Sequence, residues 1–349
     1  MKLKSRYSLI SPISLISLPF LLLPSCSNDF EVIDKWKDIT IVYGVLNQDD
    51  PVQYIRIQRA FLGKENAYTM AQSGDSIYYP DGALTVNMEE YDDNNAYLKT
   101  ISLSPTYEIA KDTGSFNNSG HKLYKSNDSL EYKNTYKLII TNNSTGKTIN
   151  AVSPLIHPVI ISKPVIGKKI NFFNKGLYQS ERIEWKSSPN GRLYQPVLRF
   201  YYAEDNNGIA GWDDTLTVDW VQMSYTAQNL TGNQSMLTDL AGEEFFKYLK
   251  SQIPENSTVS RYFIKMELLI YVAGDELSTY YSINQPSLGI VQEKPVYTNI
   301  KNNKGEDEIG IFSCRLIARV DGLSMAFDTC VELTSGQYTQ TLGFTNICQ

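Results

Sequence analysis

Apolar and polar residues alternate along much of the chain, with the period of two that is typical of β-strands. In residues 52–60, Ile55 and Ile57 fall on one face of a strand, and Arg56 and Gln58 fall on the other. The longest alternating stretch, 262–272, places six large residues on one face: Tyr262, Ile264, Met266, Leu268, Ile270 and Val272. Turn-forming asparagine, aspartate, glycine and proline separate these stretches. The pattern predicts a mainly all-β protein.

Residues 38–152 contain six or so strand-like stretches, which together predict an N-terminal β-sandwich. The clearest are 39–46, 52–60, 84–89, 97–103, 136–141 and 148–152. Residues 153–165 carry three prolines in an extended stretch, which we interpret as the junction between two domains. The isoleucines and valines of this junction indicate that it packs rather than swings freely.

Residues 166–349 repeat the style and predict a C-terminal β-sandwich, so the expected fold is two immunoglobulin- or fibronectin-III-like domains. The segments 183–185 and 193–204 resemble the tryptophan strand and the following tyrosine-rich strand of a fibronectin-III-like sandwich. A helix is expected at about 242–253, where glutamates favour the positive end and Pro254 ends the pattern. Its apolar face consists of Phe245, Leu249 and Ile253. Asp275 is expected to cap a second short helix.

The first 26 residues have a different pattern, with a basic start, an apolar run and the ending Leu23-Pro24-Ser25-Cys26. This is the plan of an export signal, and its prolines and serines interrupt it too often for a membrane-spanning helix. The ending resembles a bacterial lipobox, in which the cysteine is acylated and becomes the new N-terminus. The resemblance implies that Cys26 is lipidated and that its fatty acyl chains hold the protein in the outer membrane.

Residues 27–37 are expected to form a tether between the lipid and the first strand. Its early acidic residues, Asp29 and Glu31, resemble the tag that directs lipoproteins of the Bacteroidota to the cell surface. A solvated tether explains them equally well. Surface and periplasmic orientations therefore both stay open.

Charge and cysteine content narrow the possible partners. Removing the first 26 residues leaves 29 basic against 38 acidic residues, which argues against nucleic acid and against a basic contact with anionic lipid. With Cys26 acylated, three cysteines remain for an exported chain that can form disulfides. We expect Cys330 to pair with Cys348, and Cys314 to lie in the core as a free thiol.

No motif for catalysis, a cofactor or a metal occurs in the sequence, and we expect no enzymatic activity. The two histidines, His121 and His157, are too far apart to form a metal-binding spacing. Paired acids occur at 89–90, 92–93 and 213–214, where solvated turns or strand edges explain them better than catalysis does. The oxygen-rich segments 205–208 and 302–308 lack the spacing of a calcium loop.

Aromatic and hydroxyl residues point to two further candidate sites. Trp212 lies in a glycine-containing loop, so it is a candidate contact for a glycan, although core packing explains most of the aromatic clusters. Ser76, Ser129 and Thr215 each follow an aspartate and precede an aliphatic residue. This arrangement resembles the O-glycosylation acceptor of the Bacteroidota, which makes them candidate modification sites.

Two short motifs accompany the lipobox: an opening strand, Ile41–Asn47, and a closing pair of segments, Tyr297–Ile300 and Gly310–Phe312. Together they resemble uncharacterised lipoproteins of the Bacteroidota with a two-part β domain of unknown function. The resemblance implies a cell-envelope lipoprotein that works beside an outer-membrane transporter, and it implies no reaction. Our first hypothesis is a non-enzymatic module that binds another envelope protein. A glycan-binding surface module and a glycosidase-like enzyme with two carboxylates in a cleft are the alternatives.

Overall fold

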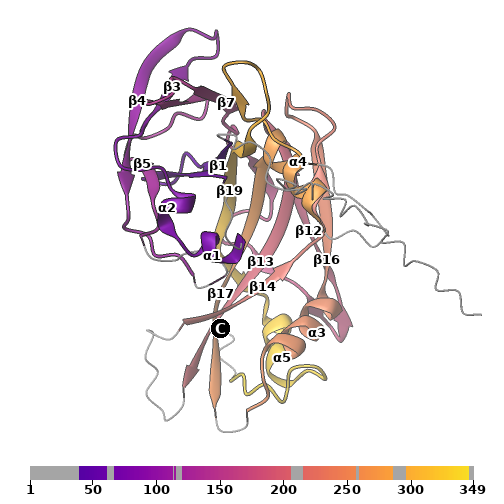
Figure 1. The fold of residues 1–349 in the computed structure, drawn as a ribbon. Coiled ribbons are helices and arrows are strands. Elements are labelled where there is room, and N and C mark those ends of the chain that lie inside the picture. The colour runs from indigo at the N-terminus through magenta and orange to yellow at the C-terminus, as the bar shows by residue number, and fades with distance from the viewer. Residues whose placement is uncertain are drawn as a thin grey trace, which may run out of the picture. The chain divides into compact units, whose positions relative to one another are not determined.

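Strands account for most of the secondary structure, so the prediction of a mainly β fold is confirmed (Figure 1). The computed structural model describes residues 39–60, 67–112, 114, 120–205, 215–256, 259–285 and 296–345. The predicted signal, Cys26 as the predicted lipidation site, and the predicted tether lie outside these residues.

The strands follow one another along the whole described part of the chain. The first nine are β1 (Thr40–Leu46), β2 (Gln53–Arg59), β3 (Leu84–Tyr91), β4 (Tyr97–Thr106), β5 (Leu123–Ser126), β6 (Thr135–Asn142), β7 (Thr148–Pro154), β8 (Ile160–Lys163) and β9 (Lys169–Ile170). The others are β10 (Phe173–Asn174), β11 (Leu177–Tyr178), β12 (Ser180–Lys186), β13 (Gly191–Asp205), β14 (Thr215–Val221), β15 (Tyr225–Thr226), β16 (Ser235–Ala241), β17 (Ser260–Gly274), β18 (Lys301–Asn302) and β19 (Ile309–Met325). The helices are α1 (Ala67–Ala71), α2 (Gly74–Ile77), α3 (Gly242–Gln252), α4 (Asp275–Asn284) and α5 (Phe327–Ser335).

The N-terminal strands form a sheet in the order β1-β2-β5-β4-β3-β6-β7-β18. Strand β4 pairs with β3 through its first part and with β5 through its last three residues, so one strand carries the hydrogen bonding around a corner. Alternate residues of β6, namely Tyr136, Leu138 and Ile140, are fully buried, as period-two patterning requires.

The C-terminal strands form two facing layers. One layer has the order β14-β13-β17-β19, and the other has the order β16-β12-β8. Trp185 of β12 lies between them, with ring centroids 6.4 Å from Tyr194 and 5.4 Å from Tyr225. Helix α3 occupies the segment where a helix was expected, and it buries Phe245 and Leu249 against this core.

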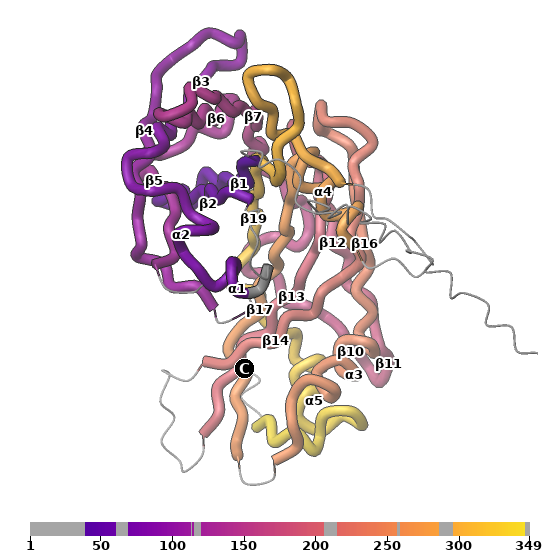
Figure 2. Tube along the Cα trace, viewed as in Figure 1, coloured from indigo at the N-terminus to yellow at the C-terminus, as the bar shows by residue number. Residues whose placement is uncertain are grey.

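Strand β19 belongs to both halves of the fold. Its residues Ile309 to Cys314 pair in parallel with β1, and residues Arg315 to Leu323 pair antiparallel with β17. Figure 2 shows the result, with indigo β1 beside yellow β19. Consequently one sheet runs through both halves, and the chain from Lys37 onward forms one compact unit.

The proline-containing junction 153–165 packs, as its composition indicates. Leu155 and Ile156 are fully buried in the core. The backbone N–H of His157 donates to the carbonyl of Pro189, and the Asn190 side chain donates to the carbonyl of Leu155 at 2.8 Å. The junction is thus fixed to the C-terminal strands.

The two motifs that carry the family resemblance meet at the β1–β19 pairing. The Asn299 side chain brackets Phe312: its Nδ2 donates to the Phe312 carbonyl at 2.7 Å, and its Oδ1 accepts from the Phe312 N–H at 2.9 Å. Phe312 pairs across the sheet with Gly44, where an added Cβ would approach the phenyl ring to 2.9 Å. The motifs therefore have a structural role, which is to position β19 on β1.

Gly310 is the tightest point of this pairing and provides a test of it. Its φ is +115°, and an added Cβ would lie 1.8 Å from the backbone oxygen of Val42. We predict that Gly310→Ala lowers the free energy of unfolding by about 3 kcal/mol or more, because the backbones of β1 and β19 must separate. Urea unfolding of the purified protein measures this difference.

Gly305→Ala is the matched control, because Gly305 has a φ of +79° with no atom within 4 Å of an added Cβ. We expect it to cost only about 1 kcal/mol, the strain of a left-handed alanine. Equal losses in the two variants would contradict the tight contact between β1 and β19.

Candidate functional site

The most accessible binding feature is an unpaired stretch of β19. Strand β1 covers one edge of β19 only as far as Cys314, because β1 ends at Leu46. From Arg315 to Leu323, no described strand pairs with that edge, while β17 pairs with the opposite one. A strand edge of this kind presents backbone donors and acceptors to which another strand can add.

A hydrogen-bonded turn decides where β1 leaves β19. The Gln53 side chain donates to the Asn47 carbonyl at 2.8 Å and accepts from the Asn47 N–H at 3.0 Å. The Asn47 side chain in turn donates to Asp50 at 2.8 Å. These contacts direct the chain away from β19, so the path that β1 would have continued along is open.

A cleft of about 680 Å³ lies along this open edge. Strand β8 lies at the edge of its three-stranded sheet and contributes the facing wall. Ile161 of β8 and the preceding Val159 line the cleft there. The cleft is completed by Gln48, Asp49 and Tyr132 from the N-terminal half, and by Pro158, Pro164 and Val165 from the junction with Ile166 directly after it, opposite β19 residues 316–320. It is therefore formed by both halves of the chain.

The wall of the cleft exposes apolar side chains to an unusual extent. The exposed fractions are 66% for Ile160 beside the cleft, and 62% and 82% for Val165 and Ile166 within it. Neighbouring exposed apolar residues of this size are typical of surfaces that bind other molecules. The isoleucine and valine content of the junction thus has a second role besides packing.

Gln48 provides a polar contact point at the end of the cleft where β1 turns away. Its Nε2 donates to the Ile156 carbonyl at 2.9 Å, which fixes the direction of the amide. Its Oε1 is buried and has no hydrogen-bond partner among the described residues. A buried acceptor without a donor costs about 1–3 kcal/mol, so this end of the cleft carries a local strain in its hydrogen bonding.

Arginines give the outer side of the edge a positive character. The side chains of Arg315 and Arg319 are 50% and 60% exposed. Arg315 contacts Asp50 at 3.1 Å through one nitrogen, and Arg319 lies 3.9 Å from the nearest oxygen of Glu267. Both guanidinium groups can therefore meet acidic side chains on a strand that adds to this edge.

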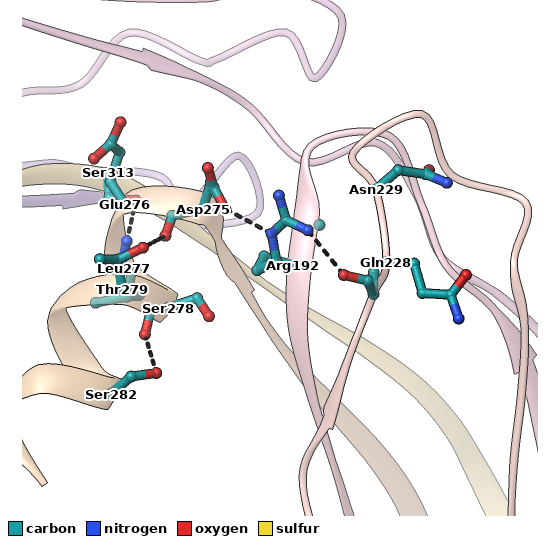
Figure 3. Close-up of polar contacts among 12 residues, drawn as sticks. Arg192, Gln228, Asn229, Asp275, Glu276, Leu277, Ser278, Thr279, Ser282 and Ser313 are labelled. Atoms are coloured by element: carbon teal, nitrogen blue, oxygen red, sulfur yellow. Dashed lines mark hydrogen bonds and ion pairs between the residues drawn. The ribbon is translucent and has the colours of Figure 1, made fainter.

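Polar contacts hold helix α4 against strands β13 and β19, as Figure 3 shows. The Arg192 guanidinium donates to Asp275 at 2.6 Å and to the Ala227 carbonyl at 2.8 Å. The backbone N–H of Leu277 donates to the Ser313 hydroxyl at 3.1 Å. These bonds tie the helix to β13 and β19, and they leave the open edge of β19 uncovered.

The cysteines divide into one bonded and one free residue among those described. Cys330 is disulfide-bonded and Cys314 is free. Cys348 lies outside the described residues, so its pairing with Cys330 stays a prediction. Burial raises the pKa of the Cys314 thiol to about 12. Cys314 lies in the core as expected, and it is unreactive at neutral pH.

The candidate modification sites differ in accessibility. Ser129 is exposed, and Thr215 is exposed at the start of β14. Ser76 lies in α2 and is partly buried, and its carbonyl accepts a hydrogen bond from Arg59 at 3.3 Å. Trp212, the candidate glycan contact, lies outside the described residues. The geometry thus favours Ser129 and Thr215 as acceptors.

The two acidic pairs that the structure describes differ: 92–93 lies in a turn, whereas 89–90 lies within β3. Asp92 accepts hydrogen bonds from the N–H groups of Asn94 and Ala96 at 2.9 and 2.8 Å, as a turn residue does. The expectation of a solvated site is wrong for Glu90, which is buried in β3. Its carboxylate accepts from Asn134 at 2.6 Å and from Tyr136 at 2.9 Å, contacts that only the folded sheet creates. The pair 213–214 lies outside the described residues.

Side chains that could bind a metal do not cluster anywhere among the described residues, and neither do the histidines. No group of three or more histidine, cysteine or acidic side chains suited to a metal occurs among the described residues. His157 packs edge-on against Tyr132 with ring centroids 5.3 Å apart. In the segment 302–308, Asn302 bonds the turn's own backbone and Glu308 bonds Thr40, so these oxygens already have partners. Most of segment 205–208 lies outside the description.

Comparison with known proteins adds no assignment. No family model matches the chain, and no curated protein matches it. Within the described ranges, the helices are all too short or too polar to cross a membrane.

The cysteine arrangement predicts a simple thiol count. With Cys330 and Cys348 paired and Cys26 acylated, the unreduced chain should release one thiol, that of Cys314, and only after denaturation. Reaction with a thiol reagent at pH 8 in guanidinium, with and without prior reduction, measures one and three thiols per chain respectively. Three thiols without reduction would refute the disulfide, and fast labelling of the native protein would contradict the burial of Cys314.

Proposed function

We propose that the protein is a lipid-anchored cell-envelope protein without catalytic activity, which binds an extended segment of another protein in the cleft along β19. The observation that carries this proposal is the open edge of β19 from Arg315 to Leu323, beside a wall of exposed apolar residues. The segment adds as a further strand, continuing the path that β1 leaves. The backbone of β19 supplies affinity, and the side-chain surroundings supply specificity.

The chemistry of the cleft describes its occupant. On the inner side, the added strand meets Leu316 and Val320 of β19 and Ile161 beyond them, so apolar residues are required at every second position. On the outer side it meets Arg315 and Arg319, so acidic residues are favoured at the positions between.

The proposal also includes the membrane anchor and the arrangement of the β modules. Cys26 carries the lipid, residues 27–37 form the tether, and two β-sandwich modules joined at 153–165 present the cleft. The bound segment belongs to a neighbouring envelope protein, for which an outer-membrane transporter is our candidate. A long tether with a cleft for an extended strand suits a protein that holds a flexible segment of a membrane-embedded partner.

Peptide binding tests the cleft directly. A nine-residue peptide in which valine and glutamate alternate should bind, whereas a valine–lysine peptide should bind at least tenfold more weakly because it repels the two arginines. Methylation of every second backbone nitrogen of the first peptide should also weaken binding at least tenfold, because it removes strand donors. Fluorescence anisotropy of the labelled peptide with the full chain measures all three affinities.

Charged substitutions in the wall separate the cleft from general hydrophobic adsorption. Ile166→Asp and Val165→Asp should each lower the affinity at least tenfold, since both side chains are exposed and their replacement leaves the core intact. Leu177→Asp is the matched control, because Leu177 is 67% exposed on another part of the surface. Unchanged binding in the wall variants, or unchanged binding of the methylated peptide, would refute strand addition at this site.

The anchor is tested by the location of Cys26→Ala in intact cells. We predict that the wild-type protein fractionates with the outer membrane and that Cys26→Ala is found soluble, since loss of the acyl chains removes the membrane affinity. Cys314→Ala is the control and should stay with the membrane. Protease treatment of whole cells then distinguishes a surface-exposed from a periplasmic protein. A Cys26→Ala protein that stays membrane-bound and unprocessed would refute the lipobox.

A further inference from the structure

A second, smaller cavity lies on the outer face of the β13-β17-β19 layer, beside helix α4. Its volume is about 230 Å³. The strands contribute Leu193, Gln195, Tyr271, Ala273 and Arg315 to its lining, and the helix contributes Tyr281. It is separate from the cleft along the edge of β19, with which it shares only Leu316 and Ile317.

The cavity results from one small residue between two large ones. Ala273 pairs with Leu193 on one side and with Arg315 on the other, so the middle of this row across the sheet has only a methyl group. In the next row, Gln195 and Ile317 flank Tyr271 in the same way and form a lower wall. The floor is therefore set by the pairing register of the three strands.

The wall contributed by α4 is held in place before any ligand arrives. The Arg192–Asp275 ion pair, at 2.6 Å, and the bond from Leu277 to the Ser313 hydroxyl, at 3.1 Å, fix the first turn of the helix on the sheet. Tyr281, 50% exposed, lies about one and a half turns further along. A preformed wall lowers the ordering cost that a ligand must overcome.

The lining is mainly apolar, with one positive charge and no negative one. No aspartate or glutamate contributes to it. The Arg315 guanidinium uses one nitrogen to reach Asp50 at 3.1 Å, and its other N–H groups have no acceptor among the described residues. Gln195 adds an amide, and Ser224 adds a hydroxyl. Apolar walls with a few converging polar groups are typical of small-molecule sites.

We propose that this cavity binds a small aromatic carboxylate, with its ring between Tyr281 and the strands and its carboxylate on Arg315. The volume is below the roughly 300 Å³ at which sites for drug-sized molecules begin, and above the roughly 150 Å³ that holds one benzene ring. One or two fused rings therefore fit, and a long acyl chain does not. Arg315 selects an anion over a cation or a neutral molecule.

Naphthalene-2-carboxylate is the probe, titrated calorimetrically into the full chain with matched buffer as the blank. We expect one site per chain. The neutral naphthalene-2-carboxamide should bind roughly tenfold more weakly, because a charge-assisted hydrogen bond is lost. Arg315→Gln should weaken carboxylate binding by a similar factor. Arg319→Gln is the matched control on the same strand, outside this cavity, and should leave the affinity unchanged.

Filling the cavity provides the second arm of the test. Ala273→Leu places a side chain in the ligand's volume and should lower the affinity at least tenfold, whereas Ala273→Ser should keep it. Tyr281→Ala, which removes an exposed wall, should also lower the affinity roughly tenfold and covers the case in which Ala273→Leu does not fold. Absence of binding to the wild type, equal binding of acid and amide, or unchanged affinity in folded Ala273→Leu and Tyr281→Ala would each overturn the proposal.

Discussion

The parallel pairing of β1 with β19 is the contact on which the rest of the fold depends. It joins residues more than 260 positions apart, and a buried carboxylate reinforces it: Glu308 accepts from the Thr40 N–H at 2.7 Å. The same carboxylate meets the Lys147 ammonium group at 2.7 Å and the Asn302 amide at 3.1 Å. One acidic side chain thus ties together the start of β1, the β6–β7 hairpin and the loop that leads into β19. Replacing Glu308 would therefore remove all three of these contacts at once.

The cleft follows from a difference in length between paired strands. β1 has seven residues and β19 has seventeen, so β1 cannot cover its neighbour to the end. The remaining edge lies where the proline-containing junction also ends in exposed apolar side chains. Natural sheets usually protect such an edge with charges, bulges or a covering segment. Here the wall beside the edge is apolar, which fits an edge that is covered by a partner.

The hydrophobic pattern of the sequence predicts where strands and helices lie, but it does not predict which strands pair with one another. Alternation located β1, β2 and β17, and the apolar spacing of Phe245 and Leu249 located α3, because periodicity is a property of consecutive residues. The β1–β19 pairing has no local signal, since a parallel partner can come from any distance along the chain. The open edge depends on that pairing, so the sequence could indicate the apolar junction but not the cleft beside it.

Glu90 shows that the burial of a single side chain can likewise depend on residues that are distant in the sequence. Its neighbours in sequence, Glu89 and Asp92, are acidic residues of the kind found on surfaces, so the sequence indicates solvation. Asn134 and Tyr136, which bury and satisfy its carboxylate, come from a strand more than 40 positions away. The sequence motif that contains Asn299 and Phe312 gives no indication that these two residues bond to each other. The two hydrogen bonds from the Asn299 side chain to the Phe312 backbone depend on the folded structure.

The order of the chain gives the β1–β19 pairing a consequence for biogenesis. β1 precedes β19 with all the strands from β2 to β18 between them, so this strand pair can form only after the whole intervening chain is available. Long-range pairing of this kind is slow to form and leaves strand edges exposed in the meantime. A chain that emerges end first from a ribosome or a translocation channel would therefore remain incompletely folded until its last segment follows. Until then β1 lacks its parallel partner, and the sheet that runs through both halves is incomplete.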